Sequence, residues 1–186
     1  NFPIQIELAK AAPALAAGCT VVLKGAPATP WSASVIGRIV AEETDIPAGV
    51  LNVITSARNS AGQRLVEHPW VDLVSFTGST ATGRAIMAAA APTLKRVFLE
   101  LGGKSAMVVL DDADMALAAM FAAYGITTHA GQGCAINTRA IVPRARTQEF
   151  LDQMNAMLDG IAYGDPTDPS VMMGPCGERR STRSTG

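Results

Sequence analysis

The segment HAGQGCAINTR, residues 129–139, contains the side chain best suited to nucleophilic chemistry. Cys134 has a glycine directly before it, Gly133, and another three positions back, Gly131. A structural cysteine usually sits in a helix or strand among bulky apolar neighbours, whereas a loop with so few side chains favours an accessible sulfur and an accessible backbone N–H. A single cysteine is more often inert than catalytic, so both readings of Cys134 stay open at this point.

A second candidate is the carboxylate of Glu100 in the segment LELGGKS. Glu100 lies between two leucines, at the end of a predicted strand and before two glycines. Partial desolvation in such a place would suit a general base. The alternative is a structural ion pair with one of the nearby cations, Lys95, Arg96 or Lys104.

Two further features suit a nucleotide. The segment FTGSTATG, residues 76–83, predicts a strand, a glycine turn and a helix whose free first-turn N–H groups attract a phosphate. The glycine spacing is not GxGxxG, so this motif taken alone favours an ordinary strand-to-helix turn. Lys24 ends another predicted strand, where a lysine either contacts a ribose or phosphate or is simply solvated.

The elements that position these residues alternate between strand and helix, which predicts a parallel α/β sheet with helices on both faces. In such sheets the ligand-binding residues follow the carboxyl ends of the strands, as Lys24, Gly78, Ser79 and Glu100 do. The predicted strands are 20–25, 49–55, 71–78, 95–101, 106–112 and 139–143. The predicted helices are 4–17 (interrupted near Pro13), 30–43, 60–69 (capped by Ser60), 80–91, 112–127 (capped by Asp112 or Asp114) and 146–160.

The composition excludes several classes of protein. Hydrophobic residues make up 48% of the chain and the net charge is −1, which is typical of a globular rather than a disordered protein. The absence of a basic excess argues against nucleic acid as a partner, and no apolar run approaches the ~20 residues that span a membrane. The three cysteines are far apart and lack zinc spacing, so we expect no metal site and a reduced, cytoplasmic location.

Taken together, these motifs resemble those of the aldehyde dehydrogenase superfamily in order and spacing. The resemblance rests on Asn1-Phe2-Pro3, TVVLKG with Thr29-Pro30, FTGST with Gly83, LELGGKS and GQGC. It implies a partial dinucleotide-binding domain of the variant Rossmann type over residues 1–101 and the start of an α/β catalytic domain over residues 102–175. The polar segment 176–186 is expected to be disordered or foreign to the fold.

The resemblance also implies an activity, the oxidation of a small-molecule aldehyde to a carboxylic acid with NAD or NADP, in a parent enzyme that is a homo-oligomer. Cys134 matches the nucleophile, Glu100 matches the base that activates water, and Asn1 matches the asparagine whose amide helps to hold the oxyanion. The residues that match cofactor contacts are Lys24 for the ribose, Gly78, Ser79 and Gly83 for the pyrophosphate turn, and Leu101.

The departures from the superfamily pattern matter for specificity. Many relatives have a ribose-binding glutamate where this chain has Pro27, and a proline where it has Gly25. The choice between NAD and NADP is therefore open, and the aldehyde is not identified. CoA-dependent acylating relatives lack the general-base glutamate, so Glu100 favours hydrolysis.

The superfamily has segments before Asn1 and after Pro175 that find no counterpart in this sequence. We therefore expect a central fragment of the enzyme that does not turn over aldehydes alone. The alternative function is that of a non-catalytic remnant that binds a nucleotide or a partner.

Overall fold

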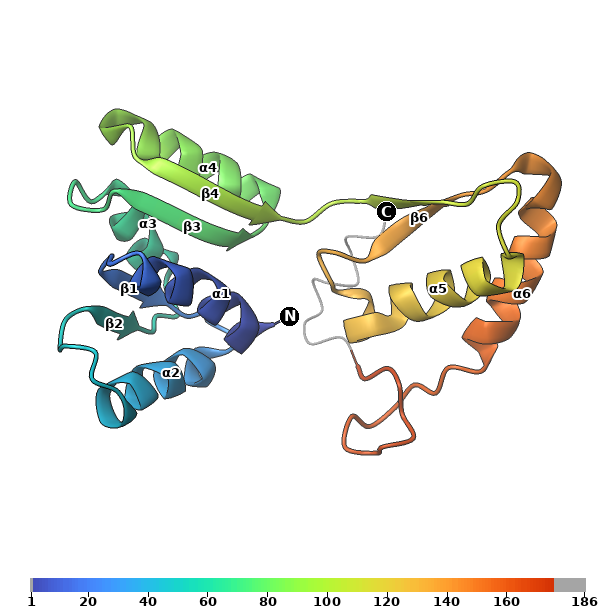
Figure 1. Cartoon of the computed structure of the whole chain (residues 1–186), viewed down its shortest axis with the longest axis horizontal. Coiled ribbons are helices and arrows are strands. Elements are labelled where there is room, and N and C mark those ends of the chain that lie inside the picture. Colours follow the sequence, from blue (N-terminus) through green and yellow to red (C-terminus); the bar gives the residue numbers. More distant parts are fainter. Residues whose placement is uncertain (1, 176–186) are drawn as a thin grey trace. The chain divides into compact units, whose positions relative to one another are not determined.

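The computed structural model describes residues 2–175, which divide into two compact units, Phe2–Leu101 and a second unit that begins at Gly102 (Figure 1). Asn1 and the tail 176–186 lie outside the described residues. Helices and parallel strands alternate in both units, which confirms the predicted α/β fold class. Each unit has a hydrophobic cluster of its own.

The first unit has the predicted order of elements, with shorter strands than expected. The predicted interruption at Pro13 is wrong, because α1 continues through Pro13 to Ala16. Proline lacks a backbone N–H, so the helix loses one hydrogen bond at this position. The Pro13 carbonyl still accepts a hydrogen bond from the Ala17 N–H. The elements are α1 Pro3–Ala16, β1 Val21–Lys24, α2 Pro30–Glu43, β2 Leu51–Ile54, α3 Asn59–Glu67, β3 Leu73–Gly78, α4 Thr80–Ala90, the 3₁₀ turn η1 Ala91–Thr93 and β4 Arg96–Leu101.

The start of α3 also differs from the prediction. Arg58 rather than Ser60 is the N-cap residue, and Ser60 lies within the first turn. The Ser56 hydroxyl accepts the Arg58 N–H at 3.1 Å, and this local turn starts the helix earlier than the Ser60 cap would.

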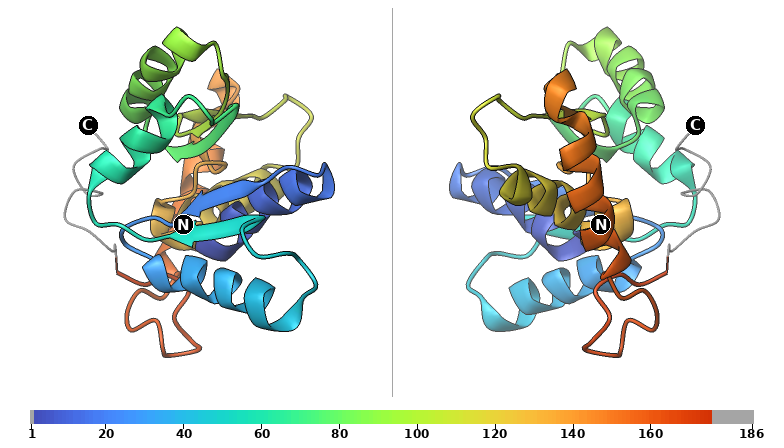
Figure 2. Two further views of the ribbon diagram at one scale, coloured as in Figure 1. Left: turned by 90° about the vertical axis from the view of Figure 1, so that its left-hand side faces the viewer. Right: turned by 90° about the vertical axis from the view of Figure 1, so that its right-hand side faces the viewer.

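The strands pair in parallel as two ladders, β1 with β2 and β3 with β4. Within residues 2–101 no ladder joins β1 to β3, so the predicted single sheet is two separate strand pairs. Figure 2 shows the two pairs and their helices from two further sides. The parallel registers place the ends of paired strands together, Lys24 beside Ile54 and Gly78 beside Leu101.

Helices α3 and α4 cover one face of the β3–β4 ladder. Val66, Ile86 and Ala90 from these helices are buried against Val74, Phe76, Val97 and Leu99 from the strands. Side chains alternate along a strand, so the intervening residues point to the other face, where the Phe98 side chain is 59% exposed. Helix α1 contacts this second face, where Lys10 Nζ donates a hydrogen bond to the Ser75 hydroxyl, so helices lie on both faces of the ladder and part of the second face is exposed.

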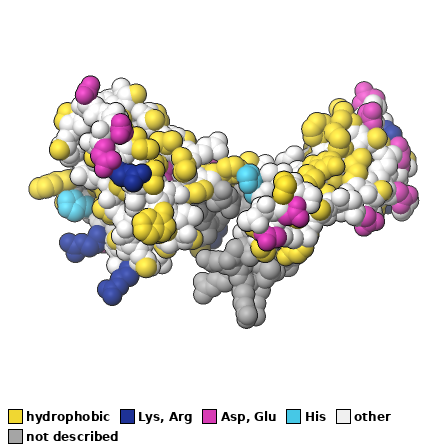
Figure 3. Space-filling view, turned by 90° about the horizontal axis from the view of Figure 1, so that it is seen from below, with side chains coloured by type: hydrophobic (Ala, Val, Ile, Leu, Met, Phe, Trp, Pro, Cys, Tyr) yellow, Lys and Arg dark blue, Asp and Glu magenta, His cyan; other side chains and the backbone are white. Residues whose placement is uncertain are grey.

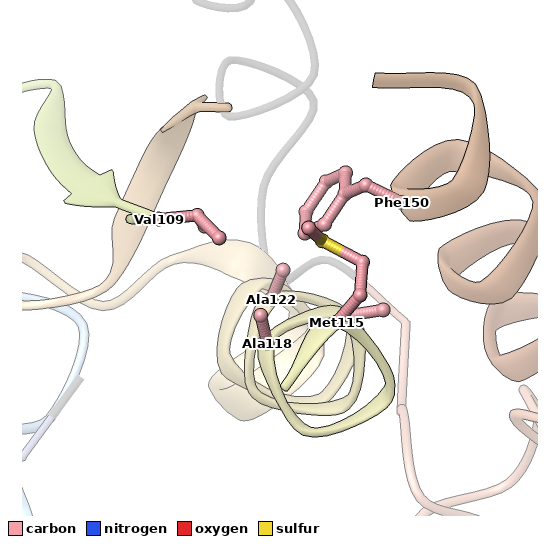
Figure 4. Packing of buried hydrophobic residues seen from close by; sticks show 6 residues of the cluster. Val109, Met115, Ala118, Ala122 and Phe150 are labelled. Carbon is pink, nitrogen blue, oxygen red and sulfur yellow. The ribbon is translucent and has the colours of Figure 1, made fainter. Parts of the chain in front are cut away.

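The second unit contains one parallel ladder, β5 (Ser105–Val108) with β6 (Asn137–Ile141), and two packed helices, α5 (Met115–Thr127) and α6 (Thr147–Asp159). Its core joins Val109, Met115, Ala118, Ala122 and Phe150. Figure 4 shows Phe150 of α6 against Met115 of α5, and Val109 on the side of Ala118 and Ala122. The Asp114 carboxylate accepts the Leu117 N–H at 3.1 Å and caps α5, as one of the two predicted caps. The elements are β5 Ser105–Val108, α5 Met115–Thr127, the 3₁₀ turn η2 Thr128–Gly131, β6 Asn137–Ile141, the 3₁₀ turn η3 Arg144–Arg146 and α6 Thr147–Asp159.

Hydrophobic side chains reach the surface in both units, as the yellow atoms in Figure 3 show. In the first unit the largest exposed ones are Trp31, Trp70 and Leu94, and in the second they include Leu110 and Phe121. Among the described residues no helix is both long and apolar enough to cross a membrane.

Candidate active site

The carboxyl edge of the β1–β2 ladder carries Lys24 as predicted. Its Nζ donates a hydrogen bond to the Gly25 carbonyl at 3.2 Å, so the ammonium is held over the start of the loop that leads to α2. Helix α3 lies alongside the same side chain, because a Cβ placed on Gly62 would be 3.6 Å from Lys24 Cδ. Pro27 lies in the loop after Lys24, which contains no acidic residue.

The turn between β3 and α4 has the strand–turn–helix form that the sequence predicts. Gly78 ends β3, and Ser79 is the N-cap residue of α4, where its hydroxyl accepts the Thr82 N–H at 3.2 Å. The α4 N-terminus therefore stands at the carboxyl end of β3, and its dipole favours an anion there. The glycine at position 78 also has a local cause, since a Cβ there would lie 2.4 Å from Cζ of Phe76.

Gly83 and Leu101 form one contact between α4 and β4. A Cβ on Gly83 would lie 3.0 Å from Leu101 Cδ2 and 3.4 Å from Leu99 Cδ1. Gly83 is buried, so its lack of a side chain lets the helix approach the strand that leads to Glu100. Gly83 would therefore affect a bound pyrophosphate only through the position of α4. Leu101 lies at the end of β4, paired with Gly78 in the parallel register.

Glu100 lies on the face of the β3–β4 ladder opposite α4, directly across from Thr77 in the parallel register. Its side chain is exposed, so the predicted partial desolvation is wrong for the first unit. Leu99 and Leu101 do not enclose it, because neighbours along a strand point to the other face. The alternative prediction fails as well, since no ion pair joins Glu100 to Lys95, Arg96 or Lys104 within the described part of the chain.

Lys10 is a charged neighbour of Glu100 that the sequence did not predict. It lies on α1, and its Nζ donates a hydrogen bond to the Ser75 hydroxyl at 3.0 Å, which brings it onto the face that carries Glu100. Burial lowers the pKa of the Lys10 ammonium, and the negative charge of Glu100 opposes part of that shift. A lone lysine within the apolar stretch LAKAAPALA was the available sequence signal.

Glu7, one helical turn before Lys10, is the most deeply buried charged side chain among the described residues, with 7% of its surface exposed. Its Oε2 has no hydrogen-bond partner in residues 2–175, and its Oε1 would lie 3.5 Å from a Cβ on Gly25. Burial raises the pKa of the Glu7 carboxyl above its ordinary value. Folding therefore makes ionisation of this carboxyl less favourable than it is in water.

Replacing Glu7 by glutamine is expected to stabilise the chain by on the order of 1 kcal/mol at pH 7.5, because the variant buries no charge. A raised folded-state pKa means that the ionisation penalty is absent below the unfolded pKa and grows as pH rises through the folded one. Urea unfolding at pH 4 and pH 7.5 measures this. The gain should vanish at pH 4, and the exposed Glu43→Gln is the matched control. No gain at pH 7.5 would refute the interpretation.

Cys134 lies in the second unit, between η2 and β6, as an exposed free thiol. The predicted accessibility of its sulfur is therefore confirmed. The turn that leads to it is unusual, because His129, Ala130 and Gly131 have positive φ angles of 53°, 54° and 73°. This left-handed turn is costly for residues other than glycine. It follows Thr128, where the backbone has already left the helical conformation of α5, and it leads into the loop with the cysteine.

Gly133, directly before the cysteine, has a packing role within the loop. A Cβ at this position would lie 2.8 Å from Cγ2 of Ile136, so any larger residue would displace Ile136. Glycine is therefore required at position 133 for packing against Ile136, and it places no side chain next to Cys134. Asn1, the predicted oxyanion residue, lies outside the described residues.

The predicted residues fall into two sets. Cys134 belongs to the second unit, and the other predicted residues described by the structure belong to the first. These are Lys24, Gly78, Ser79, Gly83, Glu100 and Leu101. In the first set the polar residues lie at the carboxyl ends of strands, as the sequence predicts. Lys24 ends β1, Ser79 follows β3, and Glu100 lies one residue before the end of β4. In residues 2–175, no three His, Cys, Asp or Glu side chains converge as metal ligands would.

Comparison with known proteins gives a consistent result. The family model described as "Aldehyde dehydrogenase family" matches residues 1–185. A 3-succinoylsemialdehyde-pyridine dehydrogenase from a Pseudomonas species is 43% identical over 175 residues, which cover 94% of this chain and 36% of the relative. The chain thus spans about a third of the length of this curated relative.

Solved structures agree with this match. An NADP-dependent enzyme from E. coli has a TM-score of 0.92 at 38% identity, covering 97% of this chain and 37% of that one. A mutant of aldehyde dehydrogenase C from Pseudomonas syringae, in complex with NAD+ and octanal, has a TM-score of 0.88 at 39% identity, covering 92% and 35%.

Proposed function

The chain belongs to the aldehyde dehydrogenase family, and we propose that it supplies the cofactor-binding residues, the general base and the nucleophile of an enzyme that oxidises an aldehyde to a carboxylic acid with NAD or NADP. The observation that carries the proposal is the exposed, free thiol of Cys134 in a loop where glycines replace side chains. A nucleophile requires this accessibility, which a structural cysteine does not.

In the first step the Cys134 thiolate attacks the aldehyde carbon, and the carbonyl oxygen takes up the negative charge. The backbone N–H of Cys134 and the side-chain amide of Asn1 would donate hydrogen bonds to that oxygen. Such donors lower the barrier because they are in place before the charge develops. The product of this step is a thiohemiacetal on the sulfur of Cys134.

The cofactor site fits a dinucleotide, since the α4 N-terminus offers an anion-binding turn after β3 and Lys24 offers a cation at the end of β1. Gly78, Ser79 and the first turn of α4 would hold the pyrophosphate, and Lys24 would contact the ribose. When bound there, a nicotinamide cofactor would supply the hydride acceptor, and Cys134 would keep the oxidised acyl group as a thioester.

Glu100 completes the reaction as the base for hydrolysis. Its carboxylate takes a proton from a water molecule that attacks the thioester carbon, and the acid leaves as the Cys134 thiolate is restored. The exposure of Glu100 supports this role, because a base that works on water needs access to it. Lys10, whose ammonium interacts with the Glu100 carboxylate, adds a positive charge beside the base.

Trapping the covalent intermediate tests this proposal. In an active protein that contains this segment, octanal and the cofactor are mixed and the reaction is quenched in acid within one turnover. We expect the acyl group on the peptide that contains Cys134, because the thioester survives at low pH. Mass spectrometry locates the group. Production of octanoic acid with no acyl group on Cys134, in a Glu100→Gln background that slows hydrolysis, would contradict the mechanism.

A further inference from the structure

The outer edge of β2 is open to a further strand. Within residues 2–175, β2 pairs only with β1. The Ile54 carbonyl accepts a hydrogen bond from the Gly25 N–H, so the backbone groups of Ile54 face β1. Backbone groups alternate between the two edges of a strand, so those of Leu51, Val53 and Thr55 point away from β1. In the described part of the chain these outward N–H and C=O groups have no hydrogen-bond partner.

A groove of about 510 Å³ runs along this open edge. It is lined by Ser34 and Gly37 of α2 and by residues 51–55 of the strand. Helix α2 packs along β2 (Figure 1). Gly37 permits this close approach, because a Cβ at that position would lie 2.9 Å from Cγ2 of Val53. The small lining residues of α2 leave space beside β2, where a neighbouring strand would lie about 4.8 Å away.

The groove itself is uncharged, and opposite charges flank its two ends along the chain. Residues 48–57 contain no charged residue and no proline, which are the residues that usually protect an edge strand from pairing. The amino end of β2 follows three exposed acidic residues, Glu42, Glu43 and Asp45. The carboxyl end of β2 is followed by the exposed cation Arg58. A ligand that is neutral along its length and oppositely charged at its ends matches this pattern.

We infer that this groove binds an extended peptide segment of a partner protein, which adds to the ladder as a third strand beside β2. The segment is uncharged where it lies along β2, basic at the end near the acidic residues and acidic at the end near Arg58. A row of N–H and C=O groups at every second residue is matched by another extended chain, because only a strand repeats its own groups with that period. The main-chain hydrogen bonds provide affinity, and the neutral groove disfavours a segment with charges at its centre.

A second copy of this chain fits the groove less well than a separate peptide. Two-fold pairing of one β2 edge with another would bring both α2 helices over the same shared edge, since α2 lines the groove in each copy. A single extended segment brings no such helix. The interaction is also separate from the proposed function, because no residue that lines the groove belongs to the proposed catalytic or cofactor-binding set.

The test uses a fluorophore-labelled peptide of alternating threonine and valine, with lysine at one end and glutamate at the other. Fluorescence anisotropy with the purified chain measures its dissociation constant. A peptide that is N-methylated at every second residue keeps one intact edge and should still bind. N-methylation of every residue should weaken binding at least about tenfold, because no edge can then donate to β2. Lysine at both ends should weaken binding about two- to fivefold at low salt and have no effect at high salt.

Two variants of α2 locate the binding site. Ser34→Arg places a long side chain in the groove from an exposed position, and it should weaken peptide binding at least about tenfold. Val35→Arg adds the same charge at the next position, which is exposed and does not line the groove, and it should leave binding unchanged. Amide hydrogen exchange gives a readout that needs no variant, since the peptide should slow exchange at Leu51, Val53 and Thr55.

Three results would overturn the inference. Absence of peptide binding would show that the open edge does not accept a strand. Equal binding of the fully N-methylated peptide would show that apolar contact rather than strand pairing holds the peptide. Protection of the Leu51 and Val53 amides that rises with protein concentration and without peptide would identify a second copy as the occupant. The proposed function would stand in each case, because aldehyde oxidation does not use this groove.

Discussion

In an active enzyme that carries this segment, replacing Cys134 by alanine is expected to abolish aldehyde oxidation and to lower kcat/KM by at least about a thousandfold. The reason is that no covalent intermediate can form without the sulfur, so neither hydride transfer nor hydrolysis has a substrate. Cys134 is exposed and free, so the substitution leaves no buried cavity and should not disturb folding. Steady-state assays that follow cofactor reduction with several aldehydes measure the loss.

Two controls separate chemistry from structure in this experiment. Cys19 is the other exposed free cysteine in residues 2–175 and lies between α1 and β1, so Cys19→Ala should retain full activity. Nucleotide binding by the Cys134→Ala variant should equal that of the unmodified protein, since the cofactor residues belong to the first unit. Activity near the unmodified level in Cys134→Ala would exclude it as the nucleophile.

Replacing Glu100 by glutamine is expected to lower the steady-state rate by about a hundred- to ten-thousandfold, which is the usual contribution of a general base. Glutamine keeps the size of the side chain and removes the carboxylate. Formation of the thioester does not need this base in the proposed mechanism, so hydrolysis alone should slow. Rapid-mixing absorbance should then show a burst of about one reduced cofactor per active site, followed by a slow phase.

The burst distinguishes a base for hydrolysis from other roles of Glu100. A residue needed only for folding would lower burst and steady state together, and a residue needed for cofactor binding would raise the cofactor KM instead. Glu43→Gln, an exposed glutamate at the end of α2, is the matched control and should leave both phases unchanged. A steady-state rate in Glu100→Gln equal to that of the unmodified enzyme would show that another group activates the water.

Local patterns in the sequence determined most of the secondary structure. The alternation of β-branched runs with helices capped by proline or aspartate predicted the order of strands and helices, including Pro30 at the start of α2 and Asp114 as the cap of α5. These features depend on neighbours within about four residues, which the sequence displays directly. The same reasoning placed Lys24, Gly78 and Glu100 at strand ends, and the motif order indicated the family.

The tertiary structure decided what surrounds those residues. The hydrogen bond from Lys10 to Ser75 joins residues that are 65 positions apart, and no local pattern predicts that a helical lysine will lie over the face that carries Glu100. Tertiary packing also determines three other features of the first unit. Glu7 is buried against Gly25, Glu100 is exposed although it lies between two leucines, and α3 approaches Lys24. Exposure and charge environment depend on which elements pack together, because side-chain periodicity sets the face of an element but not what covers it. The sequence therefore predicted which residue types carry the chemistry. Their solvent exposure and their charged neighbours were determined only by the tertiary structure.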